Sequence, residues 1–346
     1  MQGLMRNSIK SNPLSKKIPS IFVVASPLQV LCAYGTILNL QISRYKFYII
    51  RINNFRDKQT QMVADYFNLK YDIIDKDKEV YPINRRFKAI CYRRKGFKRA
   101  FVGAYCSTLH YFFALRNVTN GGVVAIIDDG NQSISVLNGN KELYTSKSCF
   151  SKLNEIFLNF SAFFRNIRLR KDFYTIYTGI SSKNFSIGIN DLSIVLKSKN
   201  SKNCRNVYIA GTAPNYIDQY TNLTYIDYLS YVNQLIKYVC NRHPNDKVIY
   251  IPHGRDDDKD IYRSCIENNV EYVRPKDCIE LYFLDLIFIP KALYGLSSSC
   301  LFTAKKMMPQ TSVYTFEINI NGYVPNSYSE FNNYLCKNLI NKIILK

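Results

Sequence analysis

The most informative stretch of this sequence reads VVAIIDDG and runs from Val123 to Gly130. Five consecutive apolar residues, four of them β-branched, predict a strand that is buried on both faces, which is typical of a parallel sheet. Two carboxylates and a glycine follow at once. Since ligands of open parallel α/β sheets bind at the carboxyl ends of the strands, the stretch indicates both an architecture and the place of a site.

Similar apolar runs alternate with helical periodicity along the chain, and this alternation predicts a parallel α/β fold. The predicted strands are Ile21–Ala25, Lys46–Arg51, Val123–Ile127, Asn206–Ala210, Lys247–Ile251, Tyr272–Arg274 and Asp285–Ile289. The predicted helices are Pro27–Leu40, Gln59–Phe67, Ala100–Asn117, Asn154–Phe164, Tyr225–Cys240 and Ile261–Asn269.

The length of 346 residues predicts two domains of ordinary size. The polar stretch Lys197–Arg205 separates two α/β series and marks the predicted boundary. We therefore expect a first domain over residues 1–200, with a basic leader over 1–18, and a second over residues 201–346. The last helix of the second domain is a candidate for packing back on the first.

The positive charge is concentrated in the first domain. Residues 1–200 carry 31 Lys and Arg against 12 Asp and Glu, a net charge of +19 out of +21 for the whole chain. The densest run is Arg85–Arg99, with eight basic and no acidic residues. Such a field attracts nucleic acid, phosphorylated glycolipid or an anionic membrane, although a basic run can also be merely solvated.

Neither a signal peptide nor a membrane span is predicted. Pro27 and Gln29 interrupt the first apolar run, which fits a strand, a turn and a helix better than a signal peptide. The longest other candidate, Leu281–Leu296, contains charged residues and a proline and falls short of the ~20 residues that a span needs. The sequence thus predicts a soluble or peripheral protein.

The ten cysteines include no CxxC pair, and three histidines are available beside them. This predicts reduced thiols in a cytosolic protein and no metal site.

Two clusters of polar residues end predicted strands and carry acid–base chemistry. Adjacent carboxylates such as Asp128 and Asp129 repel each other, which favours a raised pKa in one of them and a role as general base; an ordinary Asp-Gly turn is the alternative. In the run YIPHGR, His253 can share a proton with a leaving phosphate and Arg255 can add charge; an ordinary loop histidine is the alternative. His243 instead fits a helix stop, and His110 a histidine of the core.

Two further clusters fit the binding of a nucleotide. Ser297, Ser298 and Ser299 precede an apolar helical pattern, where hydroxyls and backbone N–H groups either cap the helix or hold a phosphate. Glu280 begins another apolar segment, so its carboxylate either lies in a helical first turn or binds a ribose diol.

Taken in order, these motifs resemble the bacterial lipooligosaccharide sialyltransferases (glycosyltransferase family 52-like), with the polysialyltransferases as more distant relatives. The matching motifs are Ser26-Pro27-Leu28-Gln29, Asp128-Asp129-Gly130, Ile209-Ala210-Gly211-Thr212, Tyr250–Arg255, Ile279-Glu280 and Ser298-Ser299. Together they extend over about residues 21 to 306. One position departs from the pattern, because Gly254 replaces the proline of the family's His-Pro motif.

The resemblance implies a GT-B fold, with two Rossmann-like domains and a cleft between them, and inverting transfer from CMP-sialic acid without a metal or another cofactor. It implies Asp129 as the base, Asp128 as the group that orients it and His253 as the partner of the leaving phosphate. The implied donor site comprises Ser297, Ser298, Ser299, Glu280, Gly211 and Pro275. Further candidates on the acceptor side are Ser26, Gln29, Asn131 and Arg255.

The implied partners are a nucleotide-sugar donor, a glycan acceptor and, through the basic first domain, the inner face of the cytoplasmic membrane; a homodimer is compatible with the sequence. Two alternatives stay open. A glycosyltransferase of the same fold could use CMP-Kdo or a glucose nucleotide. A nucleic-acid-binding protein would suit the charge and the 28 tyrosines, but it would leave the acidic pair, His253 and the serine run unexplained.

Overall fold

The computed structural model describes residues 18–51, 56–75, 96–105, 107–130, 132–139, 149–196, 202–203, 206–212, 224–253, 259–296, 298–317, 334, 337 and 341–344. The chain forms two compact units. The first unit comprises Met1–Asp129 and Val136–Asp191, and the second comprises Gly130–Ser135 and Leu192–Lys346.

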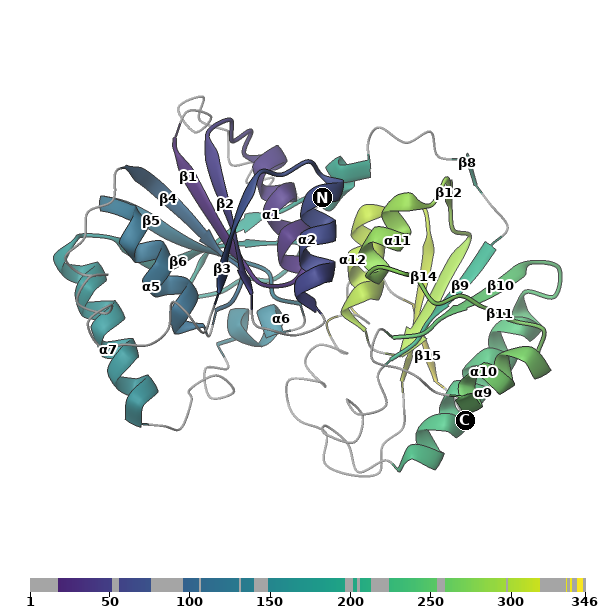
Figure 1. Cartoon of the computed structure of the whole chain (residues 1–346). Helices are drawn as coiled ribbons and strands as arrows, with labels where there is room; N and C mark the ends of the chain where they lie inside the picture. The colour runs from purple at the N-terminus through teal and green to yellow at the C-terminus, as the bar shows by residue number, and fades with distance from the viewer. Residues whose placement is uncertain are drawn as a thin grey trace, which may run out of the picture. The chain divides into compact units, whose positions relative to one another are not determined.

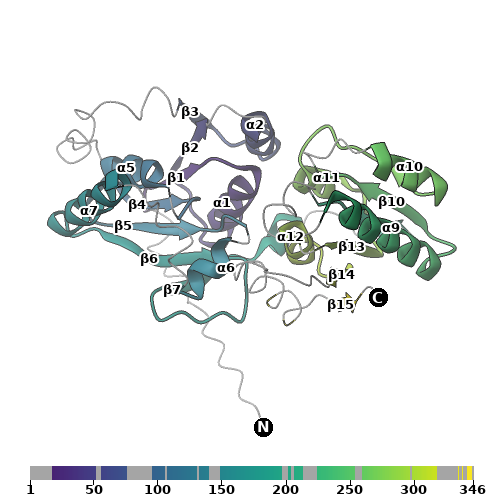
Figure 2. The same ribbon diagram turned by 90° about the horizontal axis from the view of Figure 1, so that it is seen from below.

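The first unit is a parallel sheet whose strands are connected by helices (Figures 1 and 2). The strands are β1 (Ser20–Val24), β2 (Tyr45–Arg51), β3 (Tyr71–Asp75), β4 (Phe97–Val102), β5 (Val118–Ile127), β6 (Arg168–Thr175) and β7 (Ser186–Ile189). The helices are α1 (Pro27–Asn39), α2 (Arg56–Tyr66), α5 (Thr108–Asn117) and α7 (Cys149–Phe164), and α6 (Gln132–Leu137) lies where the chain passes between the units. The strand order β3-β2-β1-β4-β5-β6-β7 is the Rossmann order extended by one strand.

Alternating side chains of β1 build the cores on the two faces of this sheet. Ile21 and Val23 join one buried cluster with residues of α5 and α7. Phe22 points to the other face, where its ring stacks on Phe47 of β2 at 5.9 Å and on Phe101 of β4 at 4.7 Å between ring centroids. Burial on both faces is the reason why these strands are continuous apolar runs.

The second unit repeats this topology. Its strands are β9 (Asn206–Ala210), β10 (Lys247–Ile251), β11 (Glu271–Tyr272), β13 (Ala292–Leu296), β14 (Ser312–Glu317) and β15 (Asn341–Ile344). Its helices are η2 (Leu192–Leu196), α9 (Tyr225–Arg242), α10 (Lys259–Glu267), α11 (Ile279–Asp285) and α12 (Ser299–Met307), and a separate pair is formed by β8 (Lys202–Asn203) and β12 (Phe288–Ile289). The order β11-β10-β9-β13-β14-β15 is again that of a Rossmann sheet.

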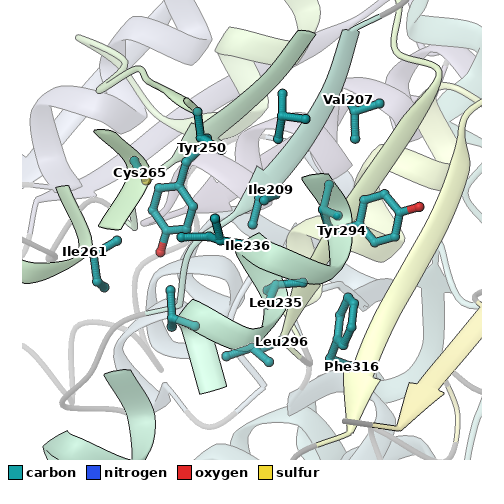
Figure 3. Close-up of a cluster of buried hydrophobic side chains, with 14 of the residues drawn as sticks. Val207, Ile209, Leu235, Ile236, Tyr250, Ile261, Cys265, Tyr294, Leu296 and Phe316 are labelled. Atoms are coloured by element: carbon teal, nitrogen blue, oxygen red, sulfur yellow. The ribbon is translucent and has the colours of Figure 1, made fainter. Parts of the chain in front are cut away.

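Helix α9 forms the core of the second unit with its apolar stripe (Figure 3). The buried residues Tyr228, Val232, Leu235, Ile236 and Val239 recur at helical spacing, so they lie on one face of α9. They pack with side chains of β9, β10 and β13 and with α10. Thr224 and Asp227 fix the start of this helix by a capping box, in which each side chain bonds the backbone N–H of the other.

The structure confirms most of the predicted elements and corrects two. The segment Ala100–Asn117 was predicted as one helix, but Ala100–Val102 completes β4 and α5 begins at Thr108. The segment Asp285–Ile289 was predicted as a strand, but Asp285 ends α11 and only Phe288 and Ile289 are extended. The strands β3, β4, β6, β7, β8, β13, β14 and β15 were not predicted as strands. At Ala100–Val102 and at Ala292–Leu296 a short apolar run carried no periodicity that separates helix from strand, whereas β3 and β6 contain charged residues that hide an apolar run.

Among the described residues, no helix is long and apolar enough to cross a membrane. The basic leader, most of Arg85–Arg99, Asn131, Arg255 and Ser297 lie outside the described residues. So does the C-terminal segment 318–340, apart from Tyr334 and Lys337.

Candidate functional site

The carboxyl ends of three neighbouring strands bring the predicted residues of the first unit together. Strands β1, β4 and β5 are adjacent and parallel. The segments that follow them therefore meet at one edge of the sheet: Ala25 to Gln29 after β1, Gly103 after β4, and Asp128 and Asp129 after β5.

Gln29 connects these segments. Ser26 is the N-cap of α1, and Pro27 occupies the first turn of this helix, which places Gln29 over the strand ends. Its Oε1 accepts a hydrogen bond from the backbone N–H of Ala25 at 2.7 Å, and its Nε2 donates to Oδ1 of Asp129 at 2.5 Å. Since the first bond needs a carbonyl and the second an amide nitrogen, the orientation of the side chain is fixed.

Gly103 leaves the space that Gln29 occupies. A Cβ atom on Gly103 would lie 2.4 Å from Oε1 and 2.6 Å from Cδ of Gln29. Gln29 is itself almost fully buried. Sequence reasoning missed Gly103 because β4 was taken for part of a helix; the signal was the apolar run Ala100-Phe101-Val102 directly before a glycine.

Asp128 is a buried structural anchor. Its side chain has no solvent exposure. Oδ1 accepts from the Thr175 hydroxyl at 2.8 Å, and Oδ2 accepts from the backbone N–H of Ile176 at 2.6 Å. Both carboxylate oxygens thus bind the end of β6, and the next residue, Asp129, is held at a fixed point on the sheet edge.

Asp129 is a partly buried carboxylate with a raised pKa. It keeps some exposure to solvent, yet protein surrounds it on most sides. This burial raises the pKa of its carboxyl above the ordinary value, while the hydrogen bond from Gln29 and the positive charge of Arg56 act in the opposite direction. The leading cause is burial rather than the repulsion between neighbouring carboxylates that the sequence suggested. Gly130 then turns the chain with φ of +75°.

The second unit gathers its predicted residues in the same way, at the carboxyl ends of β9, β10 and β13. The backbone N–H of Gly211 donates to the carbonyl of Ile251 at 2.7 Å. A Cβ on Gly211 would lie 2.7 Å from the Tyr250 hydroxyl and 3.0 Å from the backbone nitrogen of His253. Close packing thus holds the half-buried His253 beside the end of β9.

Thr212 connects the loop after β9 to the end of β13 by a hydrogen bond. Its hydroxyl donates to the carbonyl of Leu296 at 3.0 Å, and its own carbonyl accepts from the Tyr228 hydroxyl at 2.5 Å. Thr212 was identified in the sequence only as part of the Ile209–Thr212 motif.

Ser298 caps helix α12, which begins at Ser299. Its Oγ accepts from the backbone N–H of Cys300 at 3.4 Å and lies 3.1 Å from the Cys300 thiol. The first turn of α12 contains no acidic residue. A helix start with this composition favours an anion, because its N–H groups and the helix dipole both point toward negative charge.

Glu280 lies near this helix start. It belongs to the first turn of α11. Burial raises the pKa of the Cys300 thiol to about 12, and the negative charge of Glu280 adds to the effect. Pro275 follows β11, the strand beside β10, at the same edge of the sheet. Gly211, His253, Glu280 and Ser298 therefore lie at the carboxyl edge of the second sheet. Pro275 lies at the same edge, after the neighbouring strand β11.

The other two histidines are structural, as predicted. His243 is the C-cap of α9 and is largely buried, with Nε2 2.8 Å from the Tyr294 hydroxyl and Nδ1 2.9 Å from Asp246. His110 is buried in α5, and burial lowers its pKa to about 3.

A pocket of about 360 Å³ in the second unit lies apart from these residues. It is lined mainly by apolar side chains of η2, α11 and β12 and by residues at the C-terminal end of α12, among them Phe283 and Met307. None of the predicted site residues lines it. The strand-end residues, which bring polar groups together, remain the better candidates.

The sequence matches no known family model and no curated protein. Its fold does match solved structures. A 2,6-sialyltransferase from Photobacterium sp. JT-ISH-224, solved with CMP and lactose, aligns over 94% of this chain and 78% of its own, with 14% identity and a TM-score of 0.51. A Listeria monocytogenes protein assigned as a UDP-N-acetylglucosamine 2-epimerase aligns over 87% of this chain and 78% of its own, with 11% identity and a TM-score of 0.52.

Another UDP-N-acetylglucosamine 2-epimerase aligns over 93% of this chain and 88% of its own, with 10% identity and a TM-score of 0.50. This chain has the GT-B type of fold. At such identities the likeness shows the fold alone, and the same fold serves both a transferase and epimerases. The chemistry has to be argued from the residues.

Proposed function

We propose that this protein is an inverting sialyltransferase that moves sialic acid from CMP-sialic acid to a galactoside of a bacterial surface glycan, either lipooligosaccharide or capsule. The proposal combines the GT-B fold with the residues that the two sheets bring to their carboxyl edges. It assigns the acceptor to the first unit and the donor to the second.

In the first unit, Asp129 takes the proton from the acceptor hydroxyl. The oxygen then attacks the anomeric carbon of sialic acid, and the bond between this carbon and the phosphate oxygen of CMP breaks. Asp128 holds the backbone before Asp129, and Gln29 holds its Oδ1. Oδ2 of Asp129 is the oxygen that we assign to the proton transfer. Ser26 contributes through the start of α1.

In the second unit, the start of α12 binds the phosphate of CMP through Ser298 and Ser299. Glu280 binds the ribose, and the backbone near Gly211 and Pro275 lines the nucleotide. His253 donates a hydrogen bond or a proton to the departing phosphate. Preorganised donors of this kind contribute about 3–4 kcal/mol each to stabilisation of a transition state.

The single observation that carries the proposal is the contact between Gln29 and Asp129. The carboxylate ends a central strand, its pKa is raised by burial, and a buried amide of fixed orientation holds it. A turn that served only to reverse the chain would require none of these features. A general base benefits from a fixed position and from a pKa closer to the working pH, and these features supply both.

The proposed acceptors, lipooligosaccharide or capsule, are anionic. The positive charge of the first domain would attract them. We propose that this domain works at the inner face of the cytoplasmic membrane. Of the basic run, Lys98 is exposed, but Arg99 is partly buried: its Nε donates to Ser20 Oγ at 3.1 Å and its guanidinium lies 5.3 Å from the centre of the Phe101 ring. Arg99 therefore supports the sheet and is not a membrane ligand.

The experiment that tests the proposal is incubation with CMP-sialic acid and a panel of galactosides, followed by release of CMP and by product mass. We expect CMP release that depends on the acceptor and a product heavier by one sialyl residue. Parallel reactions with CMP-Kdo, UDP-glucose and UDP-N-acetylglucosamine test other donors. Transfer from one of these alone, or interconversion of a UDP-sugar without an acceptor, would exclude the proposed donor.

A further inference from the structure

Helix α7 has an inner face that belongs to the core of the first unit. Leu158 and Ala162 are buried in the cluster that also contains residues of β1 and α5. Asn154 and Ser161 are buried on the same side. Figures 1 and 2 both show α7 at the outer edge of the first unit, beside α5. The fold therefore accounts for this side of the helix.

The opposite side carries large apolar residues that are exposed and belong to none of the buried clusters of the described residues. We call these six residues the outer face of α7. Their exposed fractions are 52% for Leu153, 62% for Ile156, 39% for Phe157, 57% for Phe160, 80% for Phe163 and 67% for Phe164. The positions follow the spacing i, i+3, i+4, i+7, i+10 and i+11, so they form one continuous stripe.

The aromatic residues of the outer face already contact one another. The rings of Phe160 and Phe164 lie 4.2 Å apart and those of Phe163 and Phe164 5.7 Å apart, measured between centroids. Single exposed apolar residues are common on soluble proteins and need no explanation. A contiguous stripe of six is different, because contiguous exposed apolar patches mark sites where a protein binds another surface.

The chain segment that contains the outer face carries an excess of basic residues, which favours an anionic partner. Residues 149–172 contain five basic and two acidic residues. Both acidic residues are paired with arginine, Glu155 with Arg170 and Asp172 with Arg168. Lys152 and Lys171 are exposed. The first 200 residues as a whole carry the net charge of +19 noted above.

The size of the outer face argues against a protein partner. A helix of 16 residues is about 24 Å long and ~10 Å across. Its face covers much less than the ~800 Å² per partner of a standard interface. A bilayer needs no complementary shape, and a narrow apolar stripe next to basic residues is what interfacial helices present to it.

We infer that the outer face of α7 is a membrane-insertion surface, with its phenylalanines between the headgroups and acyl chains of an anionic bilayer. The exposed lysines add electrostatic attraction, which acts within about 10 Å at 0.1 M salt. This surface is independent of the transfer reaction, because none of its residues belongs to the candidate site.

A pair of matched variants tests this inference by flotation with vesicles of phosphatidylglycerol and phosphatidylcholine. Phe163→Gln/Phe164→Gln removes two exposed apolar residues of the outer face, and Ile226→Gln/Ile266→Gln removes two of similar exposure from the second unit. We expect the phenylalanine variant to bind roughly tenfold more weakly or worse, and the isoleucine variant to bind as the parent does. Equal binding of both variants would overturn the inference. Thermal unfolding checks that both are folded.

The absence of tryptophan from the sequence allows a direct measurement of insertion. Phe163→Trp gives the chain its sole tryptophan, and Ile226→Trp is the control. We expect vesicles to shift the emission of the first to shorter wavelength, to make it accessible to quenching by brominated lipid, and to leave the second unchanged. No shift at position 163 would refute insertion. So would a self-association that Phe163→Gln/Phe164→Gln abolishes while vesicle binding persists, since the stripe would then join two copies.

Discussion

Gln29 and Asp129 are separated by 100 positions in the sequence and joined by a hydrogen bond of 2.5 Å, in which the amide nitrogen donates to the carboxylate. The bond joins the start of α1 to the end of β5, across the strand β4 that lies between β1 and β5. Gln29 is thus a positioning residue for Asp129, and the pair leads to separable predictions.

Removal of the base is the first prediction. Asp129→Asn keeps the shape of the side chain but cannot accept the proton of the acceptor. We expect a loss of about 10²–10⁴-fold in kcat, which is typical for a general base. The affinity for CMP should not change, since the nucleotide is assigned to the second unit. Steady-state kinetics together with calorimetric titration of CMP checks both parts, and turnover near that of the parent in a folded variant would remove Asp129 from the mechanism.

The second prediction concerns pH. The base works when it is deprotonated, so activity falls as the pH drops through the pKa of Asp129, which burial has raised. Gln29→Met removes a donor that favours the charged carboxylate, so this pKa rises further and the acid limb of the kcat/KM profile moves to higher pH.

The control is Gln61→Met. Gln61 also uses its side-chain amide, but it bonds the carbonyl of Asp57 within α2. The acid limb of the kcat/KM profile of Gln61→Met should coincide with that of the parent. A Gln29→Met profile that is lower at every pH but unshifted would mean that Gln29 supports the fold and not the ionisation of Asp129.

The third prediction is a coupling between Gly103 and Gln29. In Gly103→Ala the new methyl group would overlap the end of the Gln29 side chain, which must leave Asp129. We expect activity to fall by an amount close to that of Gln29→Ala. In the Gln29→Ala background the methyl group has room, so Gly103→Ala should then have little effect. A double-mutant cycle on kcat/KM measures this coupling, and strictly additive losses would contradict it.

The fourth prediction concerns the stability of the sheet edge. Asp128→Asn leaves one acceptor oxygen where the native residue uses two, for the Thr175 hydroxyl and the Ile176 N–H. We expect the free energy of unfolding to fall by about 1–3 kcal/mol, because a buried donor loses its acceptor. Denaturant unfolding measures this loss. Thr175→Val removes the donor to Asp128 and also the acceptor of the Tyr177 N–H, so it should cost a similar amount.

The alternation of apolar runs with helices was enough to predict a parallel α/β architecture and the strands β1, β2, β5, β9 and β10, since strands buried on two faces have a distinctive composition. The predicted bounds of β9 and β10 are those of the structure. Prediction failed where runs were short. Residues 100–102 and 292–296 have apolar character but no period, and only their pairing with β1 and β9 makes them strands.

The candidate site was predictable as a set of residue types and not as a set of contacts. Asp129 and Gln29 were both identified from their motifs, but nothing local says that the amide at position 29 reaches the carboxylate at position 129. That contact depends on strand order. The same reason hid Gly103, whose importance is the absence of a side chain beside Gln29.

The last prediction compares two histidines that end different elements. His253 follows β10 and is packed beside Gly211, where we assign it to the departing phosphate. His243 ends α9 and is held by Tyr294 and Asp246 inside the second unit. His253→Ala should therefore slow turnover strongly with little change in stability. His243→Ala should lower the free energy of unfolding by about 1–3 kcal/mol, the cost of unpaired buried partners, and leave turnover of the folded fraction nearly unchanged. Turnover and thermal unfolding, measured on the same preparations, separate the two effects. If His243→Ala abolished transfer in the folded protein while His253→Ala did not, the chemistry would belong to the other end of the sheet, where β10 begins.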